Sequence, residues 1–328
     1  MRTEKYKKID ALEDFLIELN QNFAIIEKQK IEGFHQPQRP LVFVIGSPRS
    51  GTTLMMQYLA KSGVFGYPSN FISRFYESPY WAIQIQKLIL DPKYNYNNEL
   101  IDIIPDIDFS SYLGKTKGFL APNEFWYFWR RFFKFDENSN ALSPEQLLKT
   151  ESSLFLKELA AMEDAFQKPL AFKGMILNWN IEHLMDILNR KVIFIYTKRK
   201  AAYNIQSLLK ARINFRGDEK SWYSFKPPEY NELVKLDPVK QVAGQIHYTN
   251  MAIERQLERI SEKNKVIVNY EEFCESNNGL TEELNHCFKL LGHEINLNPV
   301  DYQFKSSNKI TVDDSKWHEI EKAVLYFK

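Results

Sequence analysis

Cysteine is nearly absent from the 328-residue chain, which contains only Cys274 and Cys287. Two cysteines are too few for a disulfide framework, and their spacing matches no metal-ligand pattern. No stretch approaches 18 uninterrupted apolar residues, and the first residues are charged where a secretory signal needs an apolar core. We therefore expect a cytoplasmic protein without a transmembrane segment.

An excess of either charge is also missing. The 43 Lys and Arg residues nearly balance the 42 Asp and Glu residues, and the formal net charge is +1. A general polyanion binder needs a larger excess of positive charge, and no nucleic-acid-binding module is visible. We expect no nucleic-acid partner, and any phosphate site must be a local feature.

Four apolar runs have the composition of buried strands, and three of them lead into helical patterns. This order predicts an α/β fold, a three-layer α/β/α arrangement around a central parallel sheet. The runs cover residues 41–45, 169–174, 191–196 and 265–270. No composition break divides the region 41–328, so we predict one α/β domain there.

The region ahead of the sheet has a different pattern. Residues 5–34 carry apolar side chains at helical spacing among many charges, and 35–40 contain two prolines typical of a linker. We predict an N-terminal helical extension and linker over 1–40. It could cap the domain, act as a lid or form a homodimer contact.

The segment GSPRSGTT, residues 46–53, follows the first predicted strand and has the glycine spacing of a phosphate-binding loop. Thr52 stands where a nucleotide triphosphatase carries lysine, and the cation is instead Arg49. Ser50 and Thr53 add further hydroxyl donors. Such a loop can bind a terminal phosphate through arginine, amide and hydroxyl donors without a metal.

PRSGTTL after a buried strand resembles the 5′-phosphosulfate-binding loop of sulfotransferases that use 3′-phosphoadenosine 5′-phosphosulfate (PAPS). The resemblance implies a P-loop NTPase-like fold and a donor site formed by Pro48, Arg49, Ser50, Gly51, Thr52 and Thr53. Family members also carry an arginine after a later strand and a serine eight residues on, which bind the 3′-phosphate. Arg199 and Ser207 have that spacing, although Lys200 and Ala201 replace the usual Asp-Pro.

Two further segments resemble nucleotide-binding parts of this family. KVIVNYEEF is similar to a strand whose tyrosine approaches the adenine, which implies that role for Tyr270. FKSSNKITV resembles a late segment of the bacterial members that returns over the nucleotide. It implies cofactor-binding roles for Ser307, Asn308 and Lys309.

Sulfuryl transfer requires stabilisation of the departing phosphate and removal of a proton from the acceptor hydroxyl. Arg49 would serve the first task. The resemblance implies that Lys173, at the position where the small-molecule members carry a lysine near the transferred group, stabilises the sulfuryl oxygens. Met175 replaces the catalytic histidine of the small-molecule members.

The base stays open between two carboxylates and a histidine. Glu124 lies in an aromatic segment, APNEFWYFWRRFF, where partial burial would raise its pKa, and Glu77 lies closer to the loop in the sequence. The candidate histidines are His35, His183 and His247.

The resemblance implies transfer of a sulfuryl group from PAPS to a hydroxyl group, with adenosine 3′,5′-bisphosphate as product and no metal required. A glycan or other carbohydrate is the first acceptor hypothesis and an apolar alcohol such as a sterol the second. Aromatic residues over 125–133 could form core and also line an acceptor pocket. An anionic acceptor could bind Arg74, Arg130 or Arg131.

Two other classes of protein remain as alternatives. A nucleoside or small-molecule kinase shares the strand, loop and helix, but it would need the loop lysine and a magnesium-binding carboxylate. A non-catalytic interaction protein could instead use the N-terminal helical region.

Overall fold

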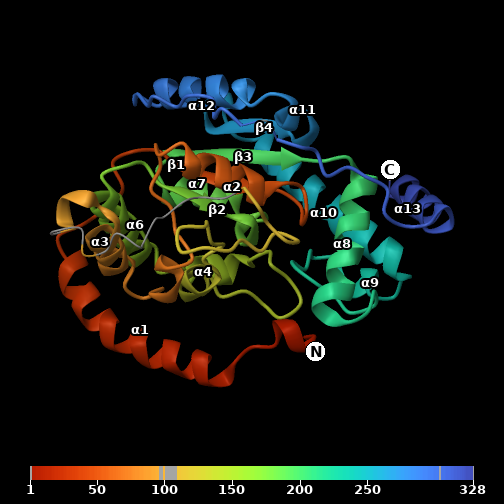
Figure 1. Cartoon of the computed structure of the whole chain (residues 1–328), viewed down its shortest axis with the longest axis horizontal. Coiled ribbons are helices and arrows are strands. Elements are labelled where there is room, and N and C mark those ends of the chain that lie inside the picture. Colours follow the sequence, from red (N-terminus) through yellow and green to blue (C-terminus); the bar gives the residue numbers. More distant parts are fainter. Residues whose placement is uncertain (1, 96–98, 100–108, 303, 328) are drawn as a thin grey trace.

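Four parallel strands form the centre of the protein in a computed structural model that describes residues 2–95, 99, 109–302 and 304–327. The order across the sheet is β2-β1-β3-β4 (Figure 1). The strands are β1 (Leu41–Ile45), β2 (Ala171–Lys173), β3 (Val192–Lys198) and β4 (Lys265–Asn269). The prediction of an α/β fold with a parallel sheet is therefore confirmed. Each strand overlaps the apolar run expected for it, and β3 continues two residues beyond its run.

Alternate residues of the strands enter different cores. Phe43 of β1 and Phe194 of β3 belong to one buried cluster, whereas Val44 and Ile195 belong to a second cluster. Successive side chains of a strand point to opposite faces, so both faces of the sheet are covered. This explains why β1 and β3 are almost continuously apolar, as parallel strands covered on both sides usually are.

Helices from distant parts of the sequence cover the two faces. The Phe43 face packs against helices α3 (Pro79–Leu90), α4 (Trp126–Phe132), α6 (Ser152–Phe166) and α7 (Ile181–Ile187). The Val44 face packs against helices α2 (Thr52–Lys61), α11 (Tyr270–Glu275) and α12 (Asn278–Leu290). The result is the predicted arrangement of three layers.

A third buried cluster lies beside the sheet and joins three helices. They are α8 (Ala201–Arg216), α10 (Pro238–Leu257) and α13 (Asp314–Tyr326), and they lie together at one end of the molecule (Figure 1). The remaining short elements are η1 (Glu4–Tyr6), η2 (Ile72–Arg74), η3 (Pro92–Tyr94), α5 (Pro144–Leu148), η5 (Met175–Leu177), α9 (Tyr230–Leu233) and η6 (Glu262–Asn264).

The predicted N-terminal helix is α1 (Asp10–Ile31), which packs against α3 and α6. Glu27 of α1 is buried and accepts a 2.9 Å hydrogen bond from the backbone amide of Tyr80, at the N-terminus of α3. Burial raises the pKa of Glu27 to about 8. The domain boundary near residue 40 stays a prediction. Within the described residues, no helix is long and apolar enough to cross a membrane.

Parallel pairing brings the carboxyl ends of all four strands to one edge. Val44 pairs with Lys173, Ile45 with Tyr196, and Lys198 with Asn269. The residues that follow these strand ends are the predicted phosphate loop, Arg199 and Tyr270. The edge outside the carboxyl ends of a parallel sheet is where α/β folds bind ligands.

Candidate active site

The loop between β1 and α2 has a backbone that requires its glycines. A Cβ atom on Gly46 would lie 2.6 Å from Ser50 Oγ, and one on Gly51 would lie 2.6 Å from the ring of Tyr270. Gly51 has a φ of +107°, and Arg49 also has a positive φ, of 69°. The chain therefore turns tightly here and lets the Tyr270 ring lie directly against it.

Backbone amides at the start of α2 are free to bind a ligand. The amides of Gly51, Thr52 and Thr53 donate no hydrogen bond to any residue that the structure describes. They lie at a helix N-terminus, where unpaired amides and the helix dipole favour an anion. Buried Asn178 supports the loop from below: its amide donates to the Gly46 carbonyl at 2.9 Å, and its oxygen accepts from the Gly46 amide at 3.3 Å.

Two arginines join the loop to β3 and α8. Arg49 Nε donates to Ser207 Oγ at 3.1 Å, and Arg199 Nη1 donates to the backbone oxygen of Arg49 at 3.0 Å. Burial lowers the pKa of both arginines, that of Arg49 to about 10. Among the described residues, neither arginine makes an ion pair with a carboxylate. Two half-buried cations held side by side without an ion-pair partner form a site for an anionic group.

The C-terminal segment 304–311 meets the same arginine. Arg199 Nε donates to Asn308 Oδ1 at 2.8 Å, and Arg199 Nη2 donates to Ser307 Oγ at 3.1 Å. The hydroxyl of Tyr270 is 3.0 Å from Ser307 Oγ, and the guanidinium of Arg199 lies 4.8 Å from the centre of the Tyr270 ring. The late segment expected over the nucleotide therefore lies beside Arg199.

A lysine–glutamate ion pair lies on the other side of the loop. Lys173 Nζ, at the end of β2, is 2.6 Å from Glu124 Oε1 and donates to Thr53 Oγ1 at 2.8 Å. The second oxygen of Glu124 accepts a hydrogen bond from the indole of Trp126. This ion pair places one cation and one carboxylate directly beside the loop.

The pKa of Glu124 is lowered, not raised as expected from its aromatic surroundings. Burial by itself raises this pKa, but the nearby cations Lys173 and Lys115 outweigh burial and hold it at about 2. Burial also lowers the pKa of Lys173, and Glu124 opposes this effect. The pair is therefore a charged one, and Glu124 is a carboxylate at neutral pH.

One cavity of about 1000 Å³ contains most of the predicted site. Its walls include Pro48, Arg49, Gly51, Thr52, Thr53, Glu124, Lys173, Arg199, Ser207, Tyr270, Ser307 and Lys309. Ser50 and Asn308 are not among the lining residues. The Ser50 hydroxyl is buried beneath the loop, close to Gly46, and Asn308 bridges Arg199 and Glu271.

The other candidate bases do not reach this cavity. Glu77 is not among the lining residues, and its backbone amide donates to Asn20 of α1 at 2.9 Å. None of His35, His183 and His247 lines the cavity either. Of the candidates, only Glu124 lies beside the loop.

Of the three arginines considered for an anionic acceptor, only Arg130 lines the cavity. Arg131 makes a two-point ion pair with buried Glu158, at 2.6 and 2.7 Å. Arg74 is exposed elsewhere. The aromatic run is divided: Phe128 and Trp129 are buried, whereas Trp126 and Tyr127 line the cavity.

Sequence reasoning missed several residues of the site. Gly114 lies in a tight turn over the loop, where a Cβ atom would be 2.5 Å from Arg49 Nη1, and Lys115 follows it into the cavity wall. The composition of LGKTKG, with two glycines and two lysines, signals a turn and could have drawn attention to it. Tyr223 also lines the cavity, and burial together with Glu124 raises its pKa to about 12. Nothing local in the sequence marks this tyrosine.

Comparison with known proteins adds one strong match. A family model described as the Sulfotransferase family matches residues 40–290, which is more than half of the chain. No curated protein sequence matches. The N-terminal helix and the segment 304–311 lie outside the matched region.

Solved structures give distant matches. The chain is similar to sulfotransferase STF9 from Mycobacterium avium, with 14% identity, a TM-score of 0.47, and coverage of 78% of this chain and 64% of that one. It is similar to sulfotransferase STF1 from Mycobacterium tuberculosis H37Rv, with 11% identity, a TM-score of 0.47, and coverage of 93% and 76%. The chain is also similar to the sulfotransferase domain from the Synechococcus PCC 7002 olefin synthase. The identity is 17%, the TM-score is 0.39, and the match covers 80% of this chain and 76% of that one. The chain thus spans less than two thirds of the first of these structures.

Proposed function

Because the chain belongs to the sulfotransferase family, we propose that it transfers a sulfuryl group from PAPS to a hydroxyl group of an acceptor. The observation that supports this most strongly is the pair of half-buried arginines, Arg49 and Arg199, which are joined through the loop backbone and make no ion pair with a described carboxylate. PAPS carries anionic groups at two separate positions, and one arginine serves each position.

The donor site follows from this pairing. Arg49, with the free amides of Gly51, Thr52 and Thr53, binds the 5′-phosphosulfate. Arg199 and Ser207 bind the 3′-phosphate, with Ser307 and Lys309 beside them in the cavity wall. Both phosphates are bound by nitrogen and hydroxyl donors alone, so we expect binding without a metal.

Lys173 and Glu124 supply the remaining chemistry. Lys173 Nζ lies 2.8 Å from Thr53 Oγ1 of the loop, where it can neutralise charge on the sulfuryl oxygens. When Lys173 turns towards those oxygens, its ion pair with Glu124 weakens, and the pKa of the Glu124 carboxylate rises. Glu124 then accepts the proton of the acceptor hydroxyl.

The transfer balances as follows. A bond forms between the acceptor oxygen and sulfur while the bond between sulfur and the 5′-phosphate oxygen breaks. The acceptor proton goes to Glu124, and adenosine 3′,5′-bisphosphate leaves with its negative charge stabilised by Arg49 and the loop amides.

For the acceptor we propose a carbohydrate hydroxyl. Stacked aromatic pairs beside the cavity suit a sugar ring: Trp126 lies on Phe225 with ring centres 5.3 Å apart, and Phe215 lies on Tyr223 at 4.8 Å. A sterol would need an uncharged pocket, but exposed cations such as Arg130 and Lys210 line this one. A kinase would need a carboxylate for magnesium at a neighbouring strand end, where this chain has Lys173 and Lys198.

Calorimetric titration with adenosine 3′,5′-bisphosphate tests the proposal. We expect micromolar binding that is unchanged by magnesium and about 100-fold weaker in Arg199→Ala, because that change removes charge-assisted hydrogen bonds. Arg74→Ala, which removes an exposed arginine outside the cavity, serves as the control. No binding, or a preference for ATP with magnesium, would contradict the proposal.

A further inference from the structure

The cavity is far more basic than the chain as a whole. Eleven cationic side chains line it, against two carboxylates, although the chain has a formal net charge of only +1. The cations are Arg2, Lys8, Arg49, Lys115, Arg130, Lys173, Arg199, Lys210, Arg216, Lys305 and Lys309. Both carboxylates already have partners, because Glu13 pairs with Lys8 and Glu124 with Lys173. The other nine cations form no ion pair with any residue that the structure describes.

The donor cannot account for all of these charges. Arg49 and Arg199 serve its two anionic positions, and Lys305 and Lys309 lie in the segment beside Arg199. Lys115 lies near enough to Glu124 and Lys173 to change the pKa of both. Four cations remain: Arg2, Arg130, Lys210 and Arg216. They are spread over the N-terminal segment, α4 and the second half of α8.

These four lie towards the acceptor side of the cavity. Lys210 is one helical turn beyond Ser207, and Arg216 is nine residues beyond it, or about 13 Å along α8 at 1.5 Å per residue. Arg130 lies over the ring of Trp126, with its guanidinium 5.4 Å from the ring centre. The acceptor aromatics and the surplus cations therefore occupy the same end.

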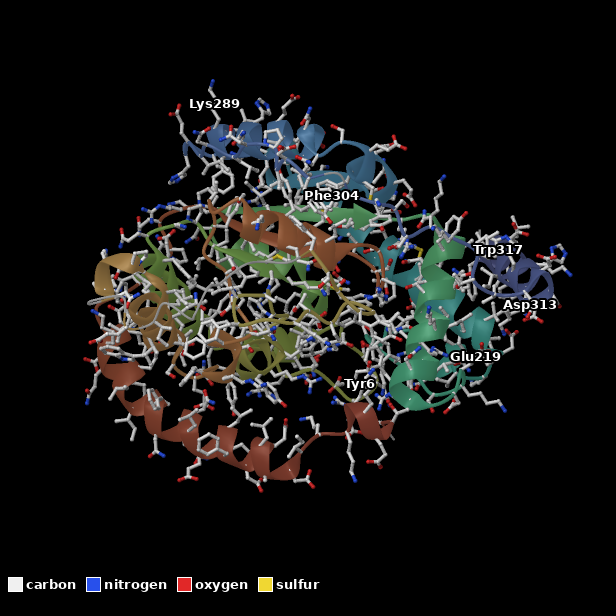
Figure 2. The ribbon with its side chains drawn as sticks, viewed as in Figure 1. Tyr6, Glu219, Lys289, Phe304, Asp313 and Trp317 are labelled. Carbon is white, nitrogen blue, oxygen red and sulfur yellow. The ribbon has the colours of Figure 1, made fainter. Side chains whose placement is uncertain are left out.

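Residues 2–9, which we call the N-terminal strap, bring Arg2 to this end. Thr3 makes two hydrogen bonds to the end of α8, from its amide to Phe215 O at 3.1 Å and from its hydroxyl to Asn214 O at 2.9 Å. The ring of Tyr6 lies 4.3 Å from that of Phe215, and Figure 2 shows Tyr6 beside the lower end of α8. Lys8 bonds the hydroxyl of Tyr127 at 2.7 Å. The strap thus connects α8 to α4 across the acceptor end.

Tyr223 connects this end with the reacting groups. Its hydroxyl is close enough to Glu124, Arg49, Arg2 and Arg216 for each to change its pKa, the carboxylate in one direction and the arginines in the other. Arg2 and Arg216 therefore share one cavity with the predicted base and the phosphate loop. A charged group bound by them can belong to the same acceptor molecule as the reacting hydroxyl.

We infer that the acceptor already carries a fixed negative charge, a carboxylate or a sulfate, and that Arg2, Lys210 and Arg216 bind it. This inference rests on the proposed sulfotransferase function and narrows its acceptor to an anionic sugar or sugar conjugate. Arg2 belongs to the strap, which lies outside the family-matched region 40–290. The strap therefore adds one cation to two, Lys210 and Arg216, that lie within the matched region.

Two probes that differ in one group test the inference: phenyl β-D-glucuronide carries a carboxylate where phenyl β-D-glucoside carries a hydroxymethyl group. Their dissociation constants are measured on the full chain saturated with adenosine 3′,5′-bisphosphate. We expect the glucuronide to bind at least tenfold tighter. Arg2→Gln/Arg216→Gln should remove most of that preference and leave the nucleotide dissociation constant unchanged. Arg74→Gln is the matched control outside the cavity.

The outcomes separate this inference from the proposed function. The inference would be overturned if the two probes bound with equal affinity or if the glucuronide did not bind measurably. It would also be overturned if the preference for the glucuronide survived in both the double variant and Lys210→Gln. Failure of the nucleotide to bind would overturn the proposed function instead. The dissociation constants of both probes are also measured without nucleotide. The effect of Arg2→Gln/Arg216→Gln on glucuronide binding can then be measured even if the nucleotide does not bind. Thermal unfolding of each variant shows that it is folded.

Discussion

The two ends of the cavity differ in how their cations are held. At the donor end, Arg49 is bonded to Ser207, and Arg199 is bonded to the loop backbone, Ser307 and Asn308. At the acceptor end, Arg130 and Lys210 are exposed and have no carboxylate partner among the described residues. The donor end is thus arranged before any ligand binds, whereas the acceptor end has side chains that a ligand must still order. Pre-ordering reduces the entropy cost of binding, so the donor should bind in the absence of acceptor.

Removing Arg49 tests this comparison with the largest expected effect. Arg49→Ala deletes the half-buried cation of the phosphate loop. We expect turnover to fall about 1000-fold or more, because a single preorganised hydrogen-bond donor in an active site contributes about 100- to 1000-fold to the rate. Sulfuryl transfer is measured from the formation of adenosine 3′,5′-bisphosphate. Phenyl β-D-glucuronide should still bind within threefold of wild type. Turnover within tenfold of wild type would show that the donor end does not depend on this arginine.

Glu124→Gln should separate chemistry from binding. The change keeps the shape of the side chain but removes the proton acceptor, so kcat should fall about 100- to 1000-fold while the nucleotide dissociation constant stays within threefold. Because Lys173 and Lys115 hold the pKa of Glu124 at about 2, the carboxylate is ionised throughout pH 5–9. Wild-type kcat/KM should therefore show no loss below pH 6 from this group. A kcat unchanged by Glu124→Gln would exclude it as the base.

Gly114→Ala should weaken the donor end alone. A Cβ atom here would lie 2.5 Å from Arg49 Nη1, and the φ of +81° disfavours any other residue. We expect about tenfold weaker binding of adenosine 3′,5′-bisphosphate by calorimetry. Gly118→Ala is a useful control, because Gly118 also has a positive φ but no atom within 4 Å of its Cβ position. Equal effects of both changes would trace the loss to backbone strain rather than to Arg49.

Glu27→Gln should have the smallest effect and should leave both ends of the cavity unchanged. Since burial raises the pKa of Glu27 to about 8, the folded protein binds this proton more tightly than the unfolded chain does. Its contribution to stability is complete below about pH 4.5 and is lost as the pH rises through 8. Relative to Glu27→Gln, wild type should therefore lose roughly 5 °C of melting temperature between pH 5 and pH 8. If the melting temperatures of wild type and Glu27→Gln changed in parallel with pH, the raised pKa of Glu27 would be contradicted.

The sequence was most informative where the local pattern determines the structure. Apolar runs predicted all four strands, and glycine spacing located the loop, because a tight turn at Gly46 and Gly51 leaves few other residues possible. The resemblance to the sulfotransferase pattern pointed to Arg199 and Ser207, and both line the cavity. Parallel strand ends meet at one edge, so these segments had to lie close together.

The residues that sequence reasoning missed or misplaced depend on contacts between distant segments. Tyr223 and Arg2 both line the cavity although they are far apart in the sequence, and no short pattern marks them. The pKa of Glu124 was misjudged because Lys173, 49 residues away, pairs with it. Glu77 was chosen by its distance along the chain, but α1 holds it away from the loop.

The strap also bears on how this enzyme could diversify. In the inferred acceptor site, Arg2 comes from a segment ahead of the first strand, and this segment docks through Thr3, Tyr6 and Lys8. New sequences over residues 2–9 that keep these three side chains can therefore dock in the same place while presenting different residues at the other positions. Substrate range could drift in evolution, or be re-engineered from a library of short N-terminal sequences, without disturbing the inherited nucleotide machinery.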